Sequence, residues 1–423
     1  MLLNKYILRD LIFLLGLLAF PMLSDHFTLF KMFDEGIFLL MSIIIFLRII
    51  SLHYQFTGFD ILFISYLLYS LFLIIYNHLP LSHIMQILIT SKFILIYLYF
   101  NSMPEEYKAK LFHAIIKMLT ILFILSVMIS ILQFILPSQF HGYSNDGRGI
   151  LGITAKGIFM SRTLYPEFLL MFIIIIFSYK KPIISIIRYQ YYLFLLSFIL
   201  IFLTFARKEL VLLILLVPFL FYDKIDQKSK PLLFSTMIIF IVLAIFAFII
   251  IFAEINASTF TDKQVRYHIY QYTMEVFNYY FPFGSGPGTF GSIMSVNYQD
   301  IYEKFSVSKQ ITGYNGQRGV IFDLFLVSLL AEYGLGWIFF ILFLITMTWN
   351  KDNPYLNPYI NLFKLRLLLF IVLLSIGIFV PILLNWVGFM IITILALISD
   401  KGKYSLPRKS KLEVENRYRI LNK

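Results

Sequence analysis

The chain has 423 residues, of which 60% are hydrophobic and only 14% charged, whereas ordinary soluble domains are about 45–50% apolar and about 25% charged. It has no cysteine, which excludes disulfides, thiolate nucleophiles and cysteine-ligated metals. The net charge of +12 is better explained by basic loops that set membrane topology than by binding to nucleic acid.

Apolar runs predict an all-α polytopic membrane protein with about twelve transmembrane helices in a single integral membrane domain. The first run follows Lys5 and Arg9 as in a signal peptide, but no small-x-small cleavage site follows it, so we expect a retained span. The predicted spans are approximately 7–23, 36–50, 59–76, 83–100, 111–136, 164–179, 191–206, 210–221, 232–253, 320–347, 364–380 and 382–398.

The distribution of Lys and Arg between these spans predicts the orientation of the chain. When the N-terminus is placed in the cytoplasm, most of the basic residues of the short loops fall on the inner side, as the positive-inside rule requires. Both termini are then cytoplasmic, with a basic tail over 400–423. Residues 137–163 form an outer loop and residues 254–319 a large extracytoplasmic segment before the tenth span, and loops of that length are usually functional.

The extracytoplasmic segment contains a predicted amphipathic helix followed by a glycine-rich stretch. The helix begins near Asp262 and carries Ile269, Tyr272 and Val276 at helical spacing. The stretch GSGPGTFGS at 284–292 contains GPGTFG, which matches the G-x-G-x-x-G pattern. A dinucleotide-binding turn requires a strand before it and a helix after it. Here a helix precedes and a polar loop follows, so we do not expect a dinucleotide site.

Lys92 lies near the middle of the fourth predicted span. A charge at the centre of a bilayer costs at least about 2.5–3.5 kcal/mol, so an ionisable residue there indicates a function or a partner. Two interpretations stay open: Lys92 pairs with a carboxylate such as Glu332 or Glu167, or it contacts the substrate.

Arg207 lies between two unusually short spans, in the tripeptide Arg207-Lys208-Glu209. Because these spans are short, we expect the tip between them to lie below the outer surface, near the lipid headgroups. A guanidinium there can bind phosphate oxygens in a bidentate manner, and Lys208 is a second candidate for substrate binding. The alternative is that Arg207 extends its side chain to the phosphate groups of membrane lipids and does not bind substrate.

Further cationic residues lie in the outer segments. Arg266 lies in the amphipathic helix, Arg162 ends the first outer loop and Arg318 ends the long segment. Together they suggest a polyanionic ligand, most simply a lipid-linked phosphate or diphosphate. Asp323, at the start of the tenth span, is a candidate general base or else lines a polar vestibule. The histidines lack ligand spacing, and we expect no metal.

Three stretches resemble the O-antigen polymerase and ligase superfamily. FLTFARKELVLLILLVPFL is similar to the family's short outer hairpin with its arginine. VRYHIYQYTMEVFNYYFPFGSGPGTFGS is similar to its pattern of an arginine, a helix and a Gly-x-Gly turn. DLFLVSLLAEYGLGWIFF is similar to the span that follows. The resemblance covers roughly residues 202–340 and rests on the order and sidedness of these motifs.

The resemblance implies a glycosyltransferase of the membrane-embedded C type without cofactors, at the outer face of the bacterial cytoplasmic membrane. Its substrates would be polyprenyl-diphosphate-linked glycans. By the same resemblance Arg207 and Arg266 would hold the diphosphate, and Asp323 is the preferred catalytic base. Gly284, Gly286 and Gly288 would form a turn or contact glycan, and Tyr270 would stack on a sugar or belong to an interfacial aromatic belt.

The resemblance also bears on which reaction is expected. The ligase branch has a His-Asn pair where the tenth span starts, whereas this chain reads VIFDLFL, which favours a polymerase of repeat units. Ligation of a finished glycan and transport of lipid-linked oligosaccharide remain alternatives, although the two similar halves expected of a transporter are not seen. Expected partners are the glycan substrates and membrane lipid, with a chain-length regulator and a flippase as candidates.

Overall fold

The computed structural model describes most of the chain. The described residues are 8–10, 12, 14–16, 33–50, 57–136, 154–159, 161, 163–180, 189–204, 206–222, 262–292, 294–298, 300–307, 325–356, 358–377 and 382–400. The ninth predicted span and the basic tail lie outside these residues, and the first span lies largely outside them.

The described residues form helices joined by short turns, and they contain no β-strand beyond isolated bridges. The α-helices are α2 (Phe33–Ile50), α3 (Gly58–Tyr76), α4 (Ile84–Asn101), α5 (Glu105–Ile135), α7 (Leu164–Ser178), α8 (Gln190–Leu203), α9 (Arg207–Phe221), α11 (Asp262–Tyr279), α12 (Asp300–Lys304), α14 (Phe325–Tyr333), α15 (Ile338–Thr348), α16 (Leu362–Gly377) and α17 (Trp386–Ile398). Short 3₁₀ turns are η2 (Leu81–His83), η4 (Gly157–Phe159), η8 (Met294–Asn297), η10 (Gly334–Trp337) and η11 (Ile382–Leu384).

The helical, apolar character agrees with a helical membrane protein. Within the described residues, four helical segments are long and apolar enough to cross a membrane: Gly58–Tyr76, Leu81–Asn101, Glu105–Ile135 and Phe325–Thr348. Shorter apolar helices include Leu164–Ser178 and Trp386–Ile398. The count of twelve spans stays a prediction.

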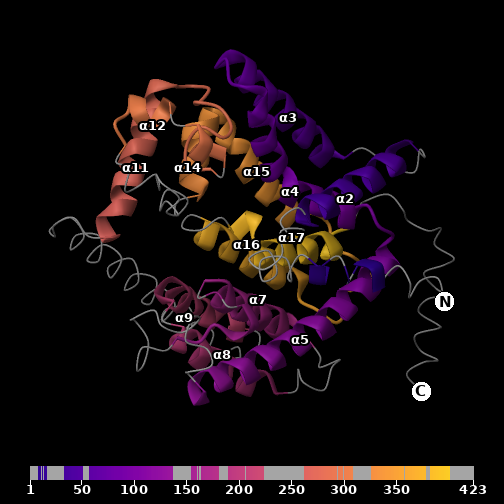
Figure 1. Ribbon diagram of the computed structural model, residues 1–423. Helices are drawn as coiled ribbons and strands as arrows, with labels where there is room; N and C mark the ends of the chain where they lie inside the picture. Colours follow the sequence, from indigo (N-terminus) through magenta and orange to yellow (C-terminus); the bar gives the residue numbers. More distant parts are fainter. Residues whose placement is uncertain are drawn as a thin grey trace.

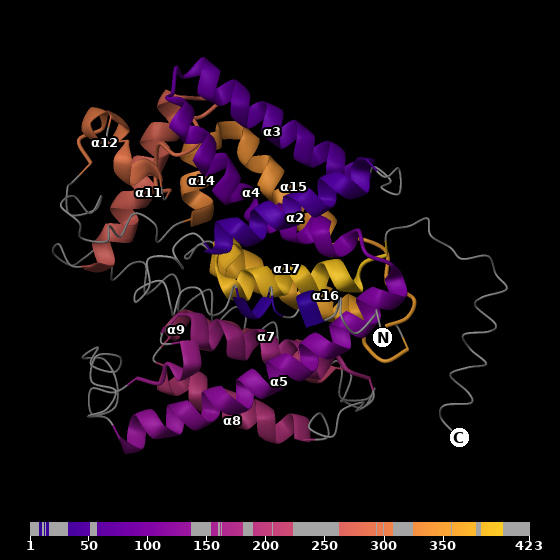
Figure 2. The ribbon, with the colours of Figure 1, turned by 45° about the vertical axis from the view of Figure 1, so that its right-hand side comes forward.

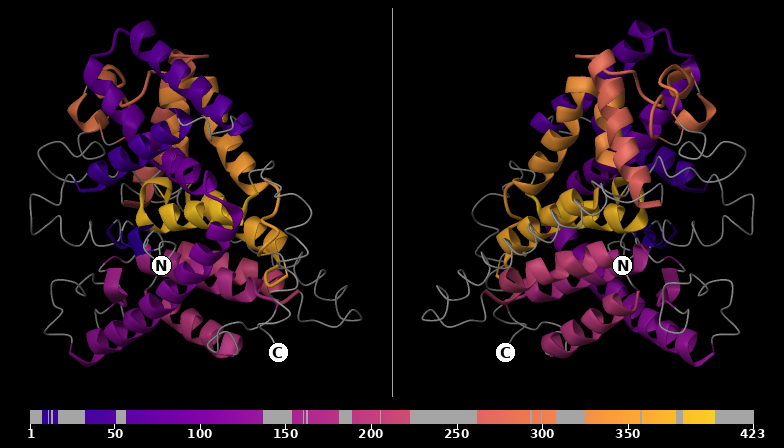
Figure 3. Two further views of the ribbon diagram at one scale, coloured as in Figure 1. Left: turned by 90° about the vertical axis from the view of Figure 1, so that its right-hand side faces the viewer. Right: turned by 90° about the vertical axis from the view of Figure 1, so that its left-hand side faces the viewer.

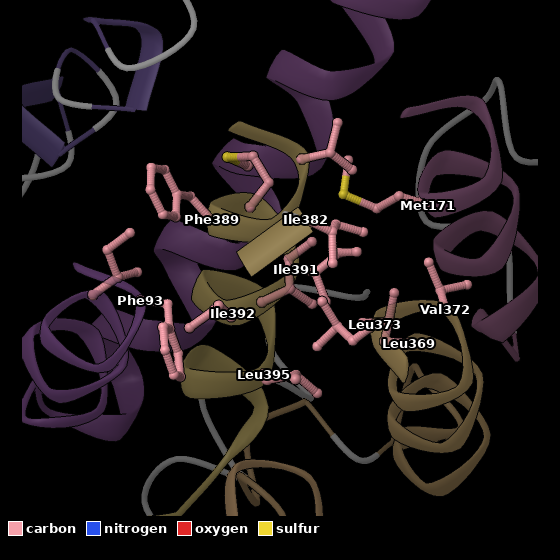
Figure 4. Packing of buried hydrophobic residues seen from close by; sticks show 14 of the residues in the cluster. Phe93, Met171, Leu369, Val372, Leu373, Ile382, Phe389, Ile391, Ile392 and Leu395 are labelled. Atoms are coloured by element: carbon pink, nitrogen blue, oxygen red, sulfur yellow. The ribbon is translucent and has the colours of Figure 1, made fainter. Parts of the chain in front are cut away.

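Two helices with apolar residues on all sides form the centre of the molecule. Every residue of α17 is buried, and in α7 every residue from Tyr165 to Ser178 is buried. This pattern is typical of a helix that other helices surround completely. Side chains from neighbouring helices converge on α17, among them Phe93 of α4, Met171 of α7, and Leu369 and Leu373 of α16 (Figure 4).

The helices lie in three groups, with α16 and α17 as the middle group (Figures 1 and 2). In Figures 1 and 2, α3, α4, α11, α14 and α15 lie on one side of α16 and α17, and α5, α7, α8 and α9 lie on the other side. Figure 3 shows the same order from two further directions. The residues matched above to family motifs therefore belong to both outer groups, with α9 in one and α11 and α14 in the other.

Hydrogen bonds join the helix ends in two sets. One set contains the ends of α7, α15 and α17 and the beginnings of α5 and α16. There, Tyr179 forms a bridge with Ile360, Asp352 forms a bridge with Ser399, and the ammonium of Lys108 donates to the Ser399 carbonyl over 2.9 Å. A cation on the carbonyl end of a helix is favourable because that end carries partial negative charge.

The second set contains the ends of α5 and α8 and the beginnings of α7, α9 and α17, and the predicted alternation of spans assigns the end of α3 and the beginning of α4 to the same side. Here the Ala155 amide donates to the Leu203 carbonyl over 3.0 Å, and the Lys156 amide donates to the Gln133 side chain over 3.0 Å. The predicted alternation of spans would place each set on one side of the membrane, and this alternation stays a prediction. Which set faces the cytoplasm stays a prediction.

Two predicted elements differ from the structure in local detail. The tenth span is interrupted at Gly334, where η10 separates α14 from α15, because Gly334 has a φ of 55°, which an α-helix does not accept. The Arg207-Lys208-Glu209 tip is not a loop but the first turn of α9, where the carboxylate of Glu209 is favoured by the helix dipole.

Candidate functional site

Helix α11 carries Arg266 and packs one face on the rest of the protein. Ile269 and Val276 are fully buried and contact a small cluster that includes Phe290, Tyr302 and Ala331. This confirms the amphipathic helix expected from the spacing of its apolar residues. Arg266 lies one helical turn before Tyr270, whose side chain is 45% exposed. The side chain of Arg266 itself lies outside the described residues.

Directly after α11 the chain forms a compact turn, residues 282–292, which we call the glycine loop. Within it Gly284 has a φ of 88° and packs against Gly334, and a Cβ at Gly284 would lie 2.4 Å from the Gly334 nitrogen. Both glycines therefore supply a positive φ and the space for backbone to touch backbone. Gly284 is therefore needed for the contact of this turn with α14 and η10.

Backbone hydrogen bonds join the glycine loop to α14 and η10. The amide of Ser285 donates to the carbonyl of Ala331 over 2.9 Å, and the amide of Gly286 donates to the carbonyl of Glu332 over 2.8 Å. In the reverse direction the amide of Leu335 donates to the Pro282 carbonyl over 2.8 Å. The loop and the interrupted tenth span thus complete each other's backbone hydrogen bonding.

The carboxyl of Glu332 adds a side-chain anchor to this contact. Its Oε1 accepts the Phe290 amide at 3.0 Å and the Ser292 hydroxyl at 2.6 Å. Glu332 is fully buried, and a buried carboxylate requires such donors because it has lost its hydration. The motif AEYGLGW shows Glu332 and two glycines in the sequence. Nothing in the sequence indicated that these residues contact the glycine loop.

Residues at the junction of α3 and α4 hold the opposite side of the loop. The Nδ1 of His83 lies 2.7 Å from the Pro287 carbonyl, and because a carbonyl can only accept, His83 donates this bond. The side-chain amide of Asn77 donates to the Gly284 carbonyl over 3.2 Å. A Cβ at Gly288 would lie only 2.9 Å from His83 Nδ1. Sequence reasoning missed both His83 and Asn77, because their partners lie more than two hundred residues away.

A tyrosine closes the far end of the loop. The hydroxyl of Tyr302 accepts the Gly291 amide at 2.8 Å and donates to the Ser295 hydroxyl over 2.6 Å. Burial raises the pKa of Tyr302, so the hydroxyl stays neutral and makes both bonds. Gly284, Gly286 and Gly288 are all buried by these protein groups, which supports their role as a turn. Their contact with glycan stays a prediction.

The beginning of α9 forms a second polar cluster, with α7 and α17. The ammonium of Lys208 lies 3.8 Å from Glu167 and 3.2 Å from Glu209. The side-chain amide of Asn385 donates to the other oxygen of Glu167 over 2.9 Å. Both carboxylates are fully buried. Lys208, which was predicted to bind substrate, thus has protein partners. Arg207 is the first residue of the same helix, and its side chain lies outside the described residues.

Lys92 pairs with a carboxylate that the sequence did not suggest. Its ammonium lies 3.3 Å from Glu35, and the Lys92 and Glu35 side chains are 11% and 49% exposed. The proposed pairing with Glu332 or Glu167 is wrong, because α2 rather than α14 or α7 packs beside this part of α4.

The remaining predicted residues are not brought together by the described structure. Arg162, Arg318 and Asp323 lie outside the described residues. Among the residues that are described, no group of three or more His, Cys, Asp or Glu side chains is arranged to hold a metal ion.

A comparison with known protein families finds a match over the part of the chain that contains most of these residues. Residues 192–335 match a family model described as O-antigen ligase. The match includes α8, α9, α11, the glycine loop and α14, and it confirms the resemblance to the O-antigen polymerase and ligase superfamily. No curated protein matches the chain at a comparable level of significance.

Proposed function

We propose that this chain, whose residues 192–335 match the O-antigen ligase family, is a glycosyltransferase that polymerises polyprenyl-diphosphate-linked oligosaccharide repeat units. The product is a surface polysaccharide such as an O-antigen or a capsule. The reaction takes place on the outer face of the cytoplasmic membrane, and the enzyme needs no nucleotide sugar because the lipid diphosphate is the leaving group.

The chemistry requires one bond to form and one to break. A hydroxyl of one lipid-linked unit attacks the anomeric carbon of the growing chain, and the bond between that carbon and the diphosphate oxygen breaks. Polyprenyl diphosphate leaves with the electron pair, and the hydroxyl proton goes to a base. Arg207 and Arg266 stabilise the charge that develops on the diphosphate, and Asp323 is the preferred base.

The observation that carries this proposal is the family match over the region with both arginines. Within that region Arg207 begins α9 and Arg266 lies in α11. In Figures 1 and 2, α9 and α11 lie on opposite sides of α16 and α17, and both lie away from the beginning of α5. A guanidinium on either helix can bind phosphate oxygens in a bidentate manner.

Polymerisation is favoured over ligation by one feature of the sequence. The start of the tenth span reads VIFDLFL, without the histidine expected of a ligase by resemblance. A carboxylate in its place can still accept the proton of an attacking sugar hydroxyl.

The test is the glycan of a deletion strain complemented with the intact chain. Loss of the polymerase leaves acceptors that carry a single repeat unit, and complementation restores a ladder of lengths. Full-length polymer that stays on the lipid carrier would instead identify a ligase. Repeat units that never reach the outer face would identify a transporter, and either result would overturn the proposal.

A further inference from the structure

The contact between Glu332 and the glycine loop has a consequence for α11. Glu332 lies on α14, and its Oε1 holds the loop through the Phe290 amide and the Ser292 hydroxyl. Its Oε2 has no close hydrogen-bond partner among the described residues, and the backbone amides of Gly288 and Thr289 also interact with the carboxyl group. The two close bonds to the loop both run to Oε1, which accepts them.

The loop is continuous with α11 and determines where that helix ends. The Tyr280 carbonyl, one residue beyond α11, accepts the Phe283 amide at 3.1 Å and the Gly284 amide at 3.0 Å. Further along α11, Ile269 and Val276 pack against Phe290 of the loop and Ala331 of α14. Moving the loop away from α14 would therefore change the direction of α11.

A small tilt of α11 at its Tyr280 end produces a large displacement of Arg266 at the other end of the helix. A rise of about 1.5 Å per residue puts Arg266 about 20 Å from Tyr280 along the helix, so a tilt of about 5° moves it by about 2 Å. Displacements of about 1 Å in a catalytic group can lower a rate about a hundredfold. The position of Arg266 is thus sensitive to how firmly the glycine loop is held.

We propose that Glu332 is a positioning residue, which holds the glycine loop on α14 through Oε1 and thereby fixes the direction of α11 and the place of Arg266. This inference rests on the proposed function, in which Arg266 binds the diphosphate. Glu332 is fully buried behind the loop and acts through the loop rather than on the substrate.

The test compares two substitutions at one position. Glu332→Gln keeps an Oε1 that accepts both bonds, whereas Glu332→Ala removes the acceptor. Glu303→Ala, at an exposed position of α12, is the matched control because it removes a carboxylate near the loop that makes no side-chain bond to it. Polymer length is measured at matched protein abundance. We expect near-normal length for Glu332→Gln and for the control, and a loss of activity of at least about tenfold for Glu332→Ala.

A second readout follows the helix itself and requires no product. The chain has no cysteine, so Val276→Cys, on the buried face of α11, reports by thiol labelling whether α11 stays on α14. We expect slow labelling when it is combined with Glu332→Gln and faster labelling when it is combined with Glu332→Ala. Tyr270→Cys, on the exposed face, should be labelled equally in both.

The outcomes separate this inference from the proposed function. If Glu332→Gln shortens the polymer as strongly as Glu332→Ala while Val276→Cys labelling stays slow, the charge of Glu332 is used in chemistry and the inference is overturned. Unchanged labelling with Glu332→Ala would overturn it as well. Should Glu332→Ala not accumulate, Ser292→Ala removes one of the two donors, and it must raise labelling for the inference to stand. A complemented strain that lacks polymer refutes the proposed function whatever the labelling shows.

Discussion

Glu167 and Glu332 show two ways in which this protein keeps a carboxylate in its interior. Glu332 accepts hydrogen bonds from an amide and a hydroxyl, and all its partners are neutral. Glu167 has a cation, Lys208, on one oxygen and the amide of Asn385 on the other. Burying a carboxylate without partners costs several kcal/mol, so each of these two residues requires its own hydrogen-bonding or ion-pair partners. In both cases the partners come from other segments of the chain, which are α9 and α17 for Glu167 and the glycine loop for Glu332.

The arginines make the sharpest prediction at this scale. If Arg207 and Arg266 grip the diphosphate, Arg207→Lys and Arg266→Lys should both fail to restore activity, because lysine keeps the charge but lacks the bidentate fork. Loss of one charge-assisted hydrogen bond in the transition state costs about 1.5–3 kcal/mol, or about ten- to a hundredfold in rate. The alanine variants should lose more.

The measurement is the ladder of polymer lengths at matched abundance, with Arg148→Ala in the other outer loop as a milder control. Wild-type ladders from both Arg207→Ala and Arg266→Ala would remove the arginines from the mechanism. A defect in only one of them would assign the diphosphate to that helix alone.

At the scale of helices and loops, the contact between the glycine loop and α14 separates what the sequence predicted from what it did not predict. Apolar runs predicted most described helices closely, since burial in a membrane or core demands them, as α3 (Gly58–Tyr76) and α17 (Trp386–Ile398) show. The spacing of Ile269 and Val276 predicted the buried face of α11. The positive φ of Gly334 was not predictable, because its cause is contact with Gly284, fifty residues earlier in the chain. His83 and Glu332 were missed as loop anchors for the same reason.

Substitution of the paired glycines tests the contact between these elements. In Gly284→Ala the new Cβ would lie 2.4 Å from the Gly334 nitrogen, and in Gly334→Ala it would lie 2.2 Å from the Pro282 carbonyl oxygen. Both positions also have positive φ, so each variant should lose on the order of 3 kcal/mol of stability or more. The measurement is the unfolding temperature of the purified protein in detergent.

Gly36→Ala is the matched control, because a Cβ at Gly36 meets no atom within 4 Å. It lies inside α2, where alanine is a better helix former than glycine by about 1 kcal/mol. We therefore expect no loss of stability for Gly36→Ala. If Gly284→Ala melted at the same temperature as Gly36→Ala, the close contact between the loop and α14 would not exist.

Across the described part of the molecule, the helix ends form two sets, which the predicted alternation of spans would place on opposite sides of the membrane. One candidate, Lys208, lies with Glu167 and Asn385 where α7, α9 and α17 begin, whereas Lys92 lies inside α4 beside Glu35 of α2. The glycine loop meets the end of α3 and the beginning of α4, as the bonds from Asn77 and His83 show. The proposed transfer between two lipid-linked substrates would require these groups on one side of the membrane, because both diphosphates would lie in the same leaflet.

The last prediction concerns which set faces outward. The positive-inside distribution of Lys and Arg predicts that the set with the glycine loop is extracytoplasmic. Single cysteines in the cysteine-free chain can be probed in intact cells with an impermeant thiol reagent. Leu81→Cys, at an exposed position beside the loop's anchors, and Gln299→Cys in the long segment should be labelled. Lys351→Cys at the opposite helix ends, Gln227→Cys and Ser410→Cys should be labelled only after the membrane is opened. The reverse pattern would place the two arginine helices on the cytoplasmic side and refute an outer-face polymerase, whereas a mixed pattern would refute the alternation itself.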